Sequence, residues 1–531
     1  MKYLLLPLSL IVGTVSVIFA QNEAGDQKKI VCYYTNWAPN RPGKAKFTPS
    51  TINPNICTHL IYAFATFSNT LGLAPGDENQ DIILNGFKEF TDLKILNENL
   101  KTQLSIGGWG ESSARFSRVA ASESRRRYFT QSAIELLRKY NFDGLNLDWQ
   151  YPTFRDGSKE EDFENYVKLV QAIREGFEEE AMMTNRSRLI ITMSVPAETE
   201  YNEQGYDLLN LQKYADFLNI LAYDYHLSYE PNVGHHSPLY PLPQEIKANI
   251  NTNLNADATV KFLLSKGMNK EQLNLGIPTY GRTYRLENND NHELGAPSKG
   301  LGIRGETSKE EGYQTYYELC ERIIAENWTV VHLNKSALGP FAYKNENWVG
   351  YDDADSVRAK GEYVRKHGLG GIMFWTIDDD DFTATCGSRS FPLIKAGREG
   401  VLGLGKRRGI TRVGKNPLVS KMTTARPTPT TITTAPTTTS ASTTTTRKVN
   451  LMEETIKNII SSVGVTTDSP KTKQENTQQS DNPTGNNIIP QPSDTAGPIK
   501  ITGTKREGGD TYHQSITVWI VNNILNFADK L

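Results

Sequence analysis

Short apolar runs recur between residues 29 and 376, and turn-forming or polar residues bound each of them. The runs are rich in β-branched and aromatic residues and are short for helices, so they predict buried β-strands. The predicted strands are residues 29–37, 59–65, 102–109, 142–150, 189–196, 217–226, 273–281 and 370–376. Near-continuous apolar strands of this kind are typical of a parallel sheet that is covered on both faces.

Amphipathic segments lie between most of the predicted strands. Their apolar residues recur three and four positions apart, which is the spacing of one helix face. The predicted helices are residues 81–97, 122–140, 159–180, 256–266 and 355–367. Eight strands that alternate with helices favour an α/β fold of the closed (β/α)8 TIM-barrel type. The alternative, an open doubly wound sheet, usually carries a glycine-rich phosphate turn after its first strand, and no such turn follows here.

The interval between the seventh and eighth predicted strands is too long for a single loop. It holds about 90 residues and contains turn signals and aromatic positions of its own, so an inserted subdomain fits better than a structureless excursion. We therefore predict a small α+β insertion at residues 282–349, within a barrel domain that spans residues 21–400.

The two ends of the chain differ from its centre. Residues 1–20 combine an early lysine, an apolar run and a small residue before a polar stretch, which predicts a cleaved signal peptide rather than a membrane anchor. Residues 401–531 include a Thr- and Pro-rich stretch that cannot bury a core, so we predict a disordered, O-glycosylated tail. The apolar stretch at residues 515–531 is interrupted by polar residues, which argues against a lipid-anchor signal. We expect a secreted, extracellular protein with no membrane span.

Charge and cysteine content narrow the function further. The formal net charge of −2 over 531 residues gives no basic footprint for nucleic acid. Secretion permits disulfides, and four cysteines allow three pairings. These cysteines are Cys32, Cys57, Cys320 and Cys386. Sequons for N-glycosylation occur at Asn185, Asn327 and Asn334.

Three polar side chains line one face of the fourth predicted strand. In the stretch FDGLNLDWQYP, residues 142–152, apolar and polar residues alternate, so Asn146, Asp148 and Gln150 share a face. Burying such a row is costly unless its members bond one another or a ligand. The pattern leaves two interpretations open, a ligand site and a buried hydrogen-bond ladder.

Aromatic and charged residues gather where the other predicted strands end, which is where (β/α)8 barrels place their active sites. These candidates are Tyr33, Trp37, Phe64, Trp109, Tyr223, Asp224, Tyr280, Arg282, Met373 and Trp375. A lone tryptophan could equally be a core residue. Three tryptophans at strand ends instead predict a groove in which indole rings stack on sugar rings.

The central motif and these strand ends resemble glycoside hydrolase family 18, the chitinases and chitinase-like lectins. The family signature runs Asp-Gly-x-Asp-x-Asp-x-Glu with Tyr-Pro following, and the segments CYYTNW, YAFA, GGW, YD, PTYGR and MFW match family segments in order. The resemblance implies disulfides Cys32–Cys57 and Cys320–Cys386 and an insertion that forms one wall of a sugar groove. We expect a monomer that binds chitin or N-acetylglucosamine oligomers and uses no metal and no cofactor.

The chain departs from the signature at two positions. Asn146 stands where the family has its middle Asp, and Gln150 stands where active members have the Glu that donates the catalytic proton. In those members the substrate acetamido oxygen attacks the anomeric carbon. The resemblance gives Asp148, Tyr223 and Asp224 the roles that position this group. A neutral amide releases no proton at ordinary pH, so we expect hydrolysis to be lost or strongly impaired.

Three alternatives remain beside a non-hydrolytic lectin. One is a weakly active endochitinase, retaining and substrate-assisted, with Glu111 as a substitute acid. Another is a growth-factor-like signalling protein on the same barrel, and a third is drift in a redundant copy. Because Asn146 removes a carboxylate beside Asp148, we also expect Asp148 to ionise more readily than in an active relative.

Overall fold

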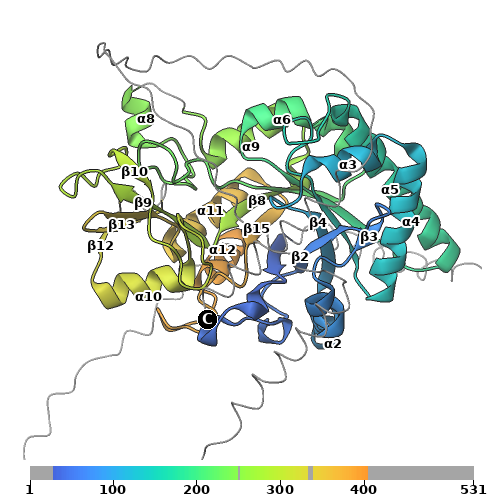
Figure 1. Ribbon diagram of the computed structural model, residues 1–531, viewed down its shortest axis with the longest axis horizontal. Helices are drawn as coiled ribbons and strands as arrows, with labels where there is room; N and C mark the ends of the chain where they lie inside the picture. The colour runs from blue at the N-terminus through green and yellow to red at the C-terminus, as the bar shows by residue number, and fades with distance from the viewer. Residues whose placement is uncertain (1–27, 249–251, 333–338, 405–531) are drawn as a thin grey trace, which may run out of the picture. The chain divides into compact units, whose positions relative to one another are not determined.

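The computed structural model describes residues 28–248, 252–332 and 339–404 (Figure 1). Within them, eight parallel strands run in the order β1-β15-β8-β7-β6-β5-β4-β2, and a β1–β2 pairing closes the ring. The strands are β1 (Lys29–Thr35), β2 (His59–Phe67), β4 (Lys101–Gly107), β5 (Gly144–Asp148), β6 (Ile190–Val195), β7 (Phe217–Ile220), β8 (Leu273–Pro278) and β15 (Gly371–Trp375). A short strand, β3 (Leu73–Ala74), adds antiparallel to β2. The predicted (β/α)8 barrel is confirmed.

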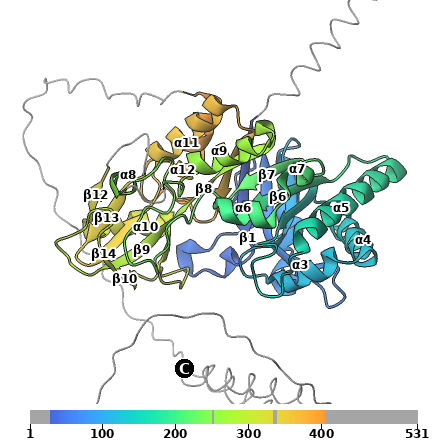
Figure 2. The same cartoon turned by 90° about the horizontal axis from the view of Figure 1, so that it is seen from above.

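Helices cover the outside of the barrel, and a large apolar core lies between them and the strands (Figure 2). They are α2 (Gly86–Leu96), α3 (Ser113–Ala120), α4 (Glu123–Lys139), α5 (Asp162–Thr184), α6 (Thr199–Gly205), α7 (Leu208–Leu211), α9 (Ala256–Ser265), α11 (Ala354–His367) and α12 (Pro392–Leu402). The short helix α8 (Pro243–Ala248) lies beside the insertion instead (Figures 1 and 2). The bounds of α11 follow from local chemistry. The Asp353 carboxylate accepts from the backbone N–H of Ser356 at its start, and Gly368 ends it with a positive φ of 69°.

The insertion is a second, antiparallel sheet with one helix, α10 (Tyr316–Glu326). Its strands are β9 (Tyr280–Leu286), β10 (Ser298–Leu301), β11 (Tyr313–Thr315), β12 (Thr329–Val331), β13 (Phe341–Lys344) and β14 (Asn347–Gly350). In both views this sheet lies on one side of the barrel, opposite α4 and α5 (Figures 1 and 2). The sheet covers a slightly longer stretch of sequence than the predicted insertion, because it begins at Tyr280 and ends at Gly350.

Several of the predicted barrel strands are too long. The strand predicted at residues 142–150 is β5, which ends at Asp148, so Gln150 lies beyond the strand. The strand predicted at residues 217–226 ends at Ile220, and a few residues later the backbone of Asp224 has a positive φ of 61°, which no strand tolerates. The strand predicted at residues 273–281 contains two elements, because β8 ends at Pro278 and Tyr280 begins β9 in the other sheet. Tyr280 and Arg282 therefore belong to the insertion sheet and not to a barrel strand. Helices α3, α6, α7, α8 and α12 were not predicted.

Both predicted disulfides, Cys32–Cys57 and Cys320–Cys386, are confirmed. Asn185 and Asn327 are exposed at the C-terminal ends of α5 and α10, where an attached glycan would meet solvent. The Asn334 sequon, the predicted signal peptide and the predicted tail lie outside the described residues. Within the described ranges, no helix has both the length and the apolar character that crossing a membrane requires.

Candidate functional site

Asn146 sits in a neutral hydrogen-bond network at the bottom of the site. Its Oδ1 accepts from the hydroxyls of Tyr33 (3.0 Å) and Ser105 (2.7 Å), and its Nδ2 donates to Thr192 Oγ1 (3.0 Å). All four side chains are buried. Asn146 is therefore held by barrel residues, as the hydrogen-bond ladder interpretation expects, and both its Oδ1 and its Nδ2 have partners other than Asp148.

Asp148 and Gln150 form the next layer towards the open end of the barrel. Gln150 Nε2 donates to Asp148 Oδ1 at 3.0 Å. Asp148 is 2% exposed, and burial raises its pKa to about 6, while hydrogen bonds from Gln150 and Ser194 act in the opposite direction. The carboxyl of Asp148 thus titrates near neutrality. That Asp148 ionises more readily than the equivalent carboxyl of an active relative stays a prediction.

A close approach of two strand ends fixes the place of Asp148. Gly108 N donates to the Asp148 carbonyl at 2.8 Å. A Cβ added at Gly107, whose φ is +112°, would lie 2.1 Å from the same carbonyl oxygen. Only glycine satisfies both the left-handed backbone and the contact, so the GGW segment serves the packing of β4 on β5 as well as presenting Trp109.

Asp224 is held by the insertion. Arg282 donates to both of its oxygens, from Nε to Oδ1 at 2.8 Å and from Nη2 to Oδ2 at 2.7 Å, and His236 Nδ1 lies 3.3 Å from Oδ1. Burial alone would raise the pKa of Asp224, but the Arg282 guanidinium and the His236 contact outweigh it and hold that pKa well below its usual range. Asp224 is therefore ionised at neutral pH and in mild acid.

A row of aromatic rings crosses the open end of the barrel. Trp375 stacks on Phe64, with centroids 5.7 Å apart and planes 26° apart, and Phe64 stacks on Trp37 at 6.2 Å and 28°. Trp37 is 44% exposed, and Phe64 and Trp375 are half-buried. Tyr33 tilts against Trp375 from below at 5.3 Å. Such a row offers flat apolar faces to a ligand.

Four of the predicted site residues, Met373, Tyr33, Tyr223 and Tyr280, lie below the surface. Met373 is fully buried in a cluster with Tyr33, Tyr223 and Tyr280, so it supports the floor and does not reach solvent. Tyr33 is 1% exposed and spends its hydroxyl on Asn146. Tyr223 is 9% exposed, with its ring 6.1 Å from that of Tyr280, and it links the barrel floor to the insertion.

Trp109 stands apart as the most exposed tryptophan among the candidates, at 66%. The Arg155 guanidinium lies 4.2 Å from its ring centroid, and Arg155 Nη1 donates to the Trp109 carbonyl at 2.6 Å. Sequence reasoning missed Arg155 because it lies in a polar run after β5 that has no period of its own. This contact orients the ring by a cation–π interaction while most of the indole stays open.

The insertion adds a second wall of rings that was also missed in part. Tyr280 and Tyr313 stack with centroids 4.5 Å apart, and Arg282 lies over both rings at 5.2 and 5.4 Å. β11 pairs with β9 so that Tyr313 faces Arg282, although the two residues are far apart along the chain. Tyr313 and His236 carry no local sequence signal, because only the pairing of distant segments brings them to Tyr280 and Asp224.

Comparison with known proteins identifies the fold family. Residues 29–380 match the model of the glycosyl hydrolases family 18. Mouse chitotriosidase-1 is 38% identical over 376 residues, which cover 71% of this chain and 78% of that protein. Pig oviduct-specific glycoprotein is 38% identical over 381 residues, 71% of this chain and 69% of its own.

Solved structures agree with the sequence matches. Group IV chitinase from Ostrinia furnacalis in complex with allosamidin is 37% identical with a TM-score of 0.68, and the match covers 71% of this chain and 99% of that one. Human YKL-39, described as a pseudo-chitinase with retained chitooligosaccharide binding, is 34% identical with a TM-score of 0.65, covering 71% and 100%. The chain belongs to glycosyl hydrolases family 18, in which its relatives include both chitinases and a pseudo-chitinase.

Proposed function

We propose that this protein binds chitin or N-acetylglucosamine oligomers and that their hydrolysis is lost or strongly impaired. The observation that carries the proposal is the neutral amide of Gln150, hydrogen-bonded to Asp148 at 3.0 Å beside an open row of aromatic rings. The row suits the apolar faces of pyranose rings. Human YKL-39, a relative, is described as retaining chitooligosaccharide binding as a pseudo-chitinase.

The roles of the polar residues follow from their chemistry. Asp148, ionised for the most part at neutral pH, accepts the acetamido N–H of a bound sugar, and the Tyr223 hydroxyl donates to the acetamido oxygen. Gln150 spends one N–H on Asp148 and keeps a second for the glycosidic oxygen. No proton can pass from this amide to the leaving oxygen, so the bound oligomer stays intact.

The nearby acid that could substitute for the missing donor is already engaged. Glu111 Oε1 accepts from Arg115 Nε at 2.8 Å, and its Oε2 also contacts Arg115 and Thr66. The Glu111 side chain is 7% exposed. Both Glu111 oxygens are thus held by Arg115, away from a glycosidic oxygen, which disfavours the weakly active endochitinase.

The chain is further proposed to act outside the cell as a monomer. The predicted signal peptide, the two disulfides and the exposed Asn185 and Asn327 sequons support secretion.

Calorimetry with oligomers of increasing length, combined with mass spectrometry of the same mixtures, tests the proposal. We expect the affinity to rise with chain length while the oligomers stay uncut. Cleavage at the rates of ordinary chitinases, or an absence of binding at any length, would contradict it. The Trp375→Ala variant serves as the control, because removing one stacking face should weaken binding without changing the products.

A further inference from the structure

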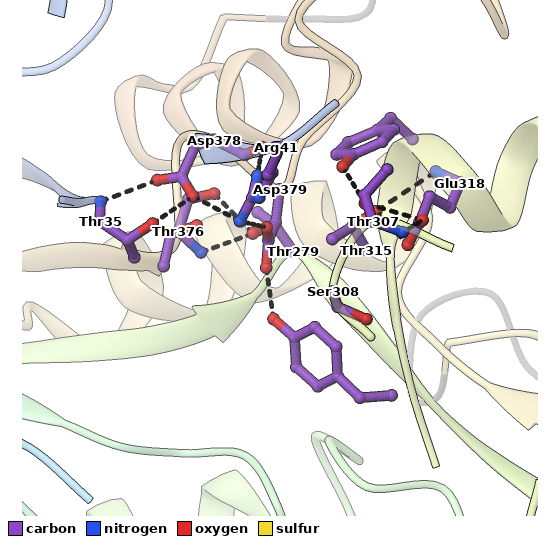
Figure 3. Close-up of polar contacts among 12 residues, drawn as sticks. Thr35, Arg41, Thr279, Thr307, Ser308, Thr315, Glu318, Thr376, Asp378 and Asp379 are labelled. Atoms are coloured by element: carbon purple, nitrogen blue, oxygen red, sulfur yellow. Dashed lines mark hydrogen bonds and ion pairs between the residues drawn. The ribbon is translucent and has the colours of Figure 1, made fainter. Parts of the chain in front are cut away.

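A buried group of charges lies behind the insertion wall, outside the residues that the proposed function uses. Arg41 Nη2 donates to Asp378 Oδ2 at 2.9 Å and to Asp379 Oδ1 at 2.7 Å, and Figure 3 shows the guanidinium between the two carboxylates. The exposed fractions of the three residues are 8%, 0% and 2%. One cation thus serves two buried carboxylates.

The two carboxylates are not equally well supplied with partners. Asp378 also accepts from the backbone N–H of Thr35 at 3.0 Å and from its hydroxyl at 2.7 Å, both on the barrel (Figure 3). Asp379 has Arg41 on one oxygen, and the hydroxyl of Tyr313 donates to the other. Asp378 is therefore anchored within the barrel, whereas Asp379 reaches out of it to the insertion.

Tyr313 carries this contact to the groove. Its ring stacks on Tyr280 at 4.5 Å and lies below the Arg282 guanidinium, and Arg282 holds Asp224 by two hydrogen bonds. Tyr313 also packs against the aromatic cluster that contains Tyr280 and borders Trp375. Asp379 is thus linked to the groove by its hydrogen bond from Tyr313 and by the stacking of the Tyr313 ring on Tyr280.

The strength of the tether depends on the charge of Asp379. Burial raises the pKa of Asp379 to about 7, with Arg41 acting against the rise and Asp378 adding to it. The other titratable groups packed near it are Tyr313 on β11 and Tyr317 and Glu318 on α10. Hydrogen bonds to an ionised acceptor are roughly twice as strong as those between neutral groups, so the ionised form holds Tyr313 more firmly.

We propose that Asp379 is a positioning residue for glycan binding, which holds the Tyr313 ring against Tyr280 and Arg282 and so sets the grip of the insertion wall on an oligomer. The inference rests on the proposed function of the groove. It adds that the affinity for an oligomer depends on pH through Asp379, a residue outside the groove.

Two variants and a control test this role by calorimetry with one long N-acetylglucosamine oligomer at about pH 5.5 and about pH 8. Tyr313→Phe keeps the ring and loses the tether, and we expect its affinity at the higher pH to fall by about 3- to 10-fold. Asp379→Asn should show a similar loss at the higher pH and a much smaller one at the lower pH, where the wild-type carboxyl is already protonated. Tyr317→Phe, whose hydroxyl bonds Thr307 in the same subdomain, should stay within about twofold at both.

The outcomes separate this inference from the proposed function. Wild-type binding that neither Tyr313→Phe nor Asp379→Asn changes would overturn the positioning role and leave the lectin function intact. A loss for Asp379→Asn that is equal at both pH values would also overturn it, because a merely structural residue acts at every pH. Absence of wild-type binding would overturn both. If Asp379→Asn does not fold, Tyr313→Phe decides alone, since it changes one hydroxyl.

Discussion

Asp148 and Asp224 are carboxylates of one groove, and the chain surrounds them in opposite ways. Asp148 on the barrel side has the neutral amide of Gln150 as its partner, and burial raises its pKa to about 6. Asp224 accepts two hydrogen bonds from Arg282 and lies beside His236, and its pKa is held well below the usual range. Asp148 therefore changes its protonation state near neutral pH, whereas Asp224 stays ionised there.

The difference agrees with the proposed loss of hydrolysis. Gln150 and Asn146, the two predicted departures from the family signature, both lie on the barrel side, where their hydrogen-bond partners include the uncharged Thr192. The Asp224–Arg282 pair and its stacked tyrosines keep their full set of partners on the insertion side. A groove altered only on the side that performs proton transfer would bind without cutting, which is what we propose.

The largest effect should come from rebuilding the barrel side. Gln150→Glu combined with Asn146→Asp should create hydrolysis, because on the proposed roles Asp148, Tyr223 and Asp224 already position the acetamido group and the double change supplies the proton source. A glutamate beside buried Asp148 should have a raised pKa, as a general acid needs. We expect a rate gain of about 10²–10⁴ over wild type, measured as disaccharide released with retained anomeric configuration.

The substitution Asn146→Asp introduces a carboxylate into the buried hydrogen-bond network. The network can accept it if the donors and acceptors beside it exchange roles. Thr192 Oγ1 now accepts from Asn146 and donates to Gln103 Oε1 at 2.7 Å, while Gln103 Nε2 is buried without a partner. If the Gln103 amide flips, Nε2 donates to Thr192 and the Thr192 hydroxyl donates to the new carboxylate. Gln150→Glu alone is the matched control and should be less active. A double variant that folds and binds but releases no sugar would show that the groove has diverged beyond its proton donor.

Breaking the insertion side should cost stability as well as binding. Arg282→Gln leaves Asp224 with His236 and no cation, so we expect the free energy of unfolding to fall by about 2–3 kcal/mol and the oligomer affinity to drop. Urea titration and calorimetry measure the two effects. Arg285→Gln on the same strand is the control, because Arg285 is 53% exposed and should change stability by less than about 0.5 kcal/mol. Equal effects of the two substitutions would remove the contrast between the two sides.

The contributions of Asp148 and Asp224 to stability should change with pH in opposite directions. The pKa of Asp148 is raised on folding, so its contribution is present below the unfolded pKa of about 4 and is lost as pH rises through about 6. The pKa of Asp224 is lowered, so its contribution is present above about pH 4 and is lost as pH falls further. Asp148→Asn should therefore gain about 2 kcal/mol relative to wild type between about pH 4.5 and pH 7.5.

Urea titrations of both proteins at the two pH values give this difference directly. A shift between Asp148→Asn and wild type that is the same at both values would mean that Asp148 is ionised in the folded protein throughout, and its contrast with Asp224 would disappear.

The sequence predicted the barrel well because its strands are continuous apolar runs, as in the KIVCYYT of β1. It failed where such a run crosses from one sheet to another. The apolar residues of LNLGIPTYGR predict one continuous strand, although Pro278 marks the end of β8 before β9 begins at Tyr280. The strand end at Tyr223 was misplaced for a related reason, because the apolar residues after Ile220 belong to an irregular segment.

Candidate residues were found where one local motif contains them and missed where distant segments meet. Asp148 ends β5 and Gln150 lies two residues further on in the same local motif, so their closeness follows from their spacing along the chain. Arg155, Tyr313 and Asp379 reach the groove only through tertiary contacts with Trp109, Tyr280 and Tyr313 respectively. No periodicity along the chain encodes such contacts.

The smallest effect should come from the exposed ring on the barrel side. Trp109→Ala should weaken oligomer binding by about 1–2 kcal/mol and leave the free energy of unfolding little changed, because Trp109 is 66% exposed and its ring is held from one side by Arg155. Calorimetry and urea titration give the two values. The control is Tyr128→Ala, an exposed aromatic on α4 that should not affect binding. If Trp109→Ala binds like wild type, Trp109 contributes no stacking. The stacking energy on the barrel side would then come from the Trp375 row alone, beside the tyrosines of the insertion side.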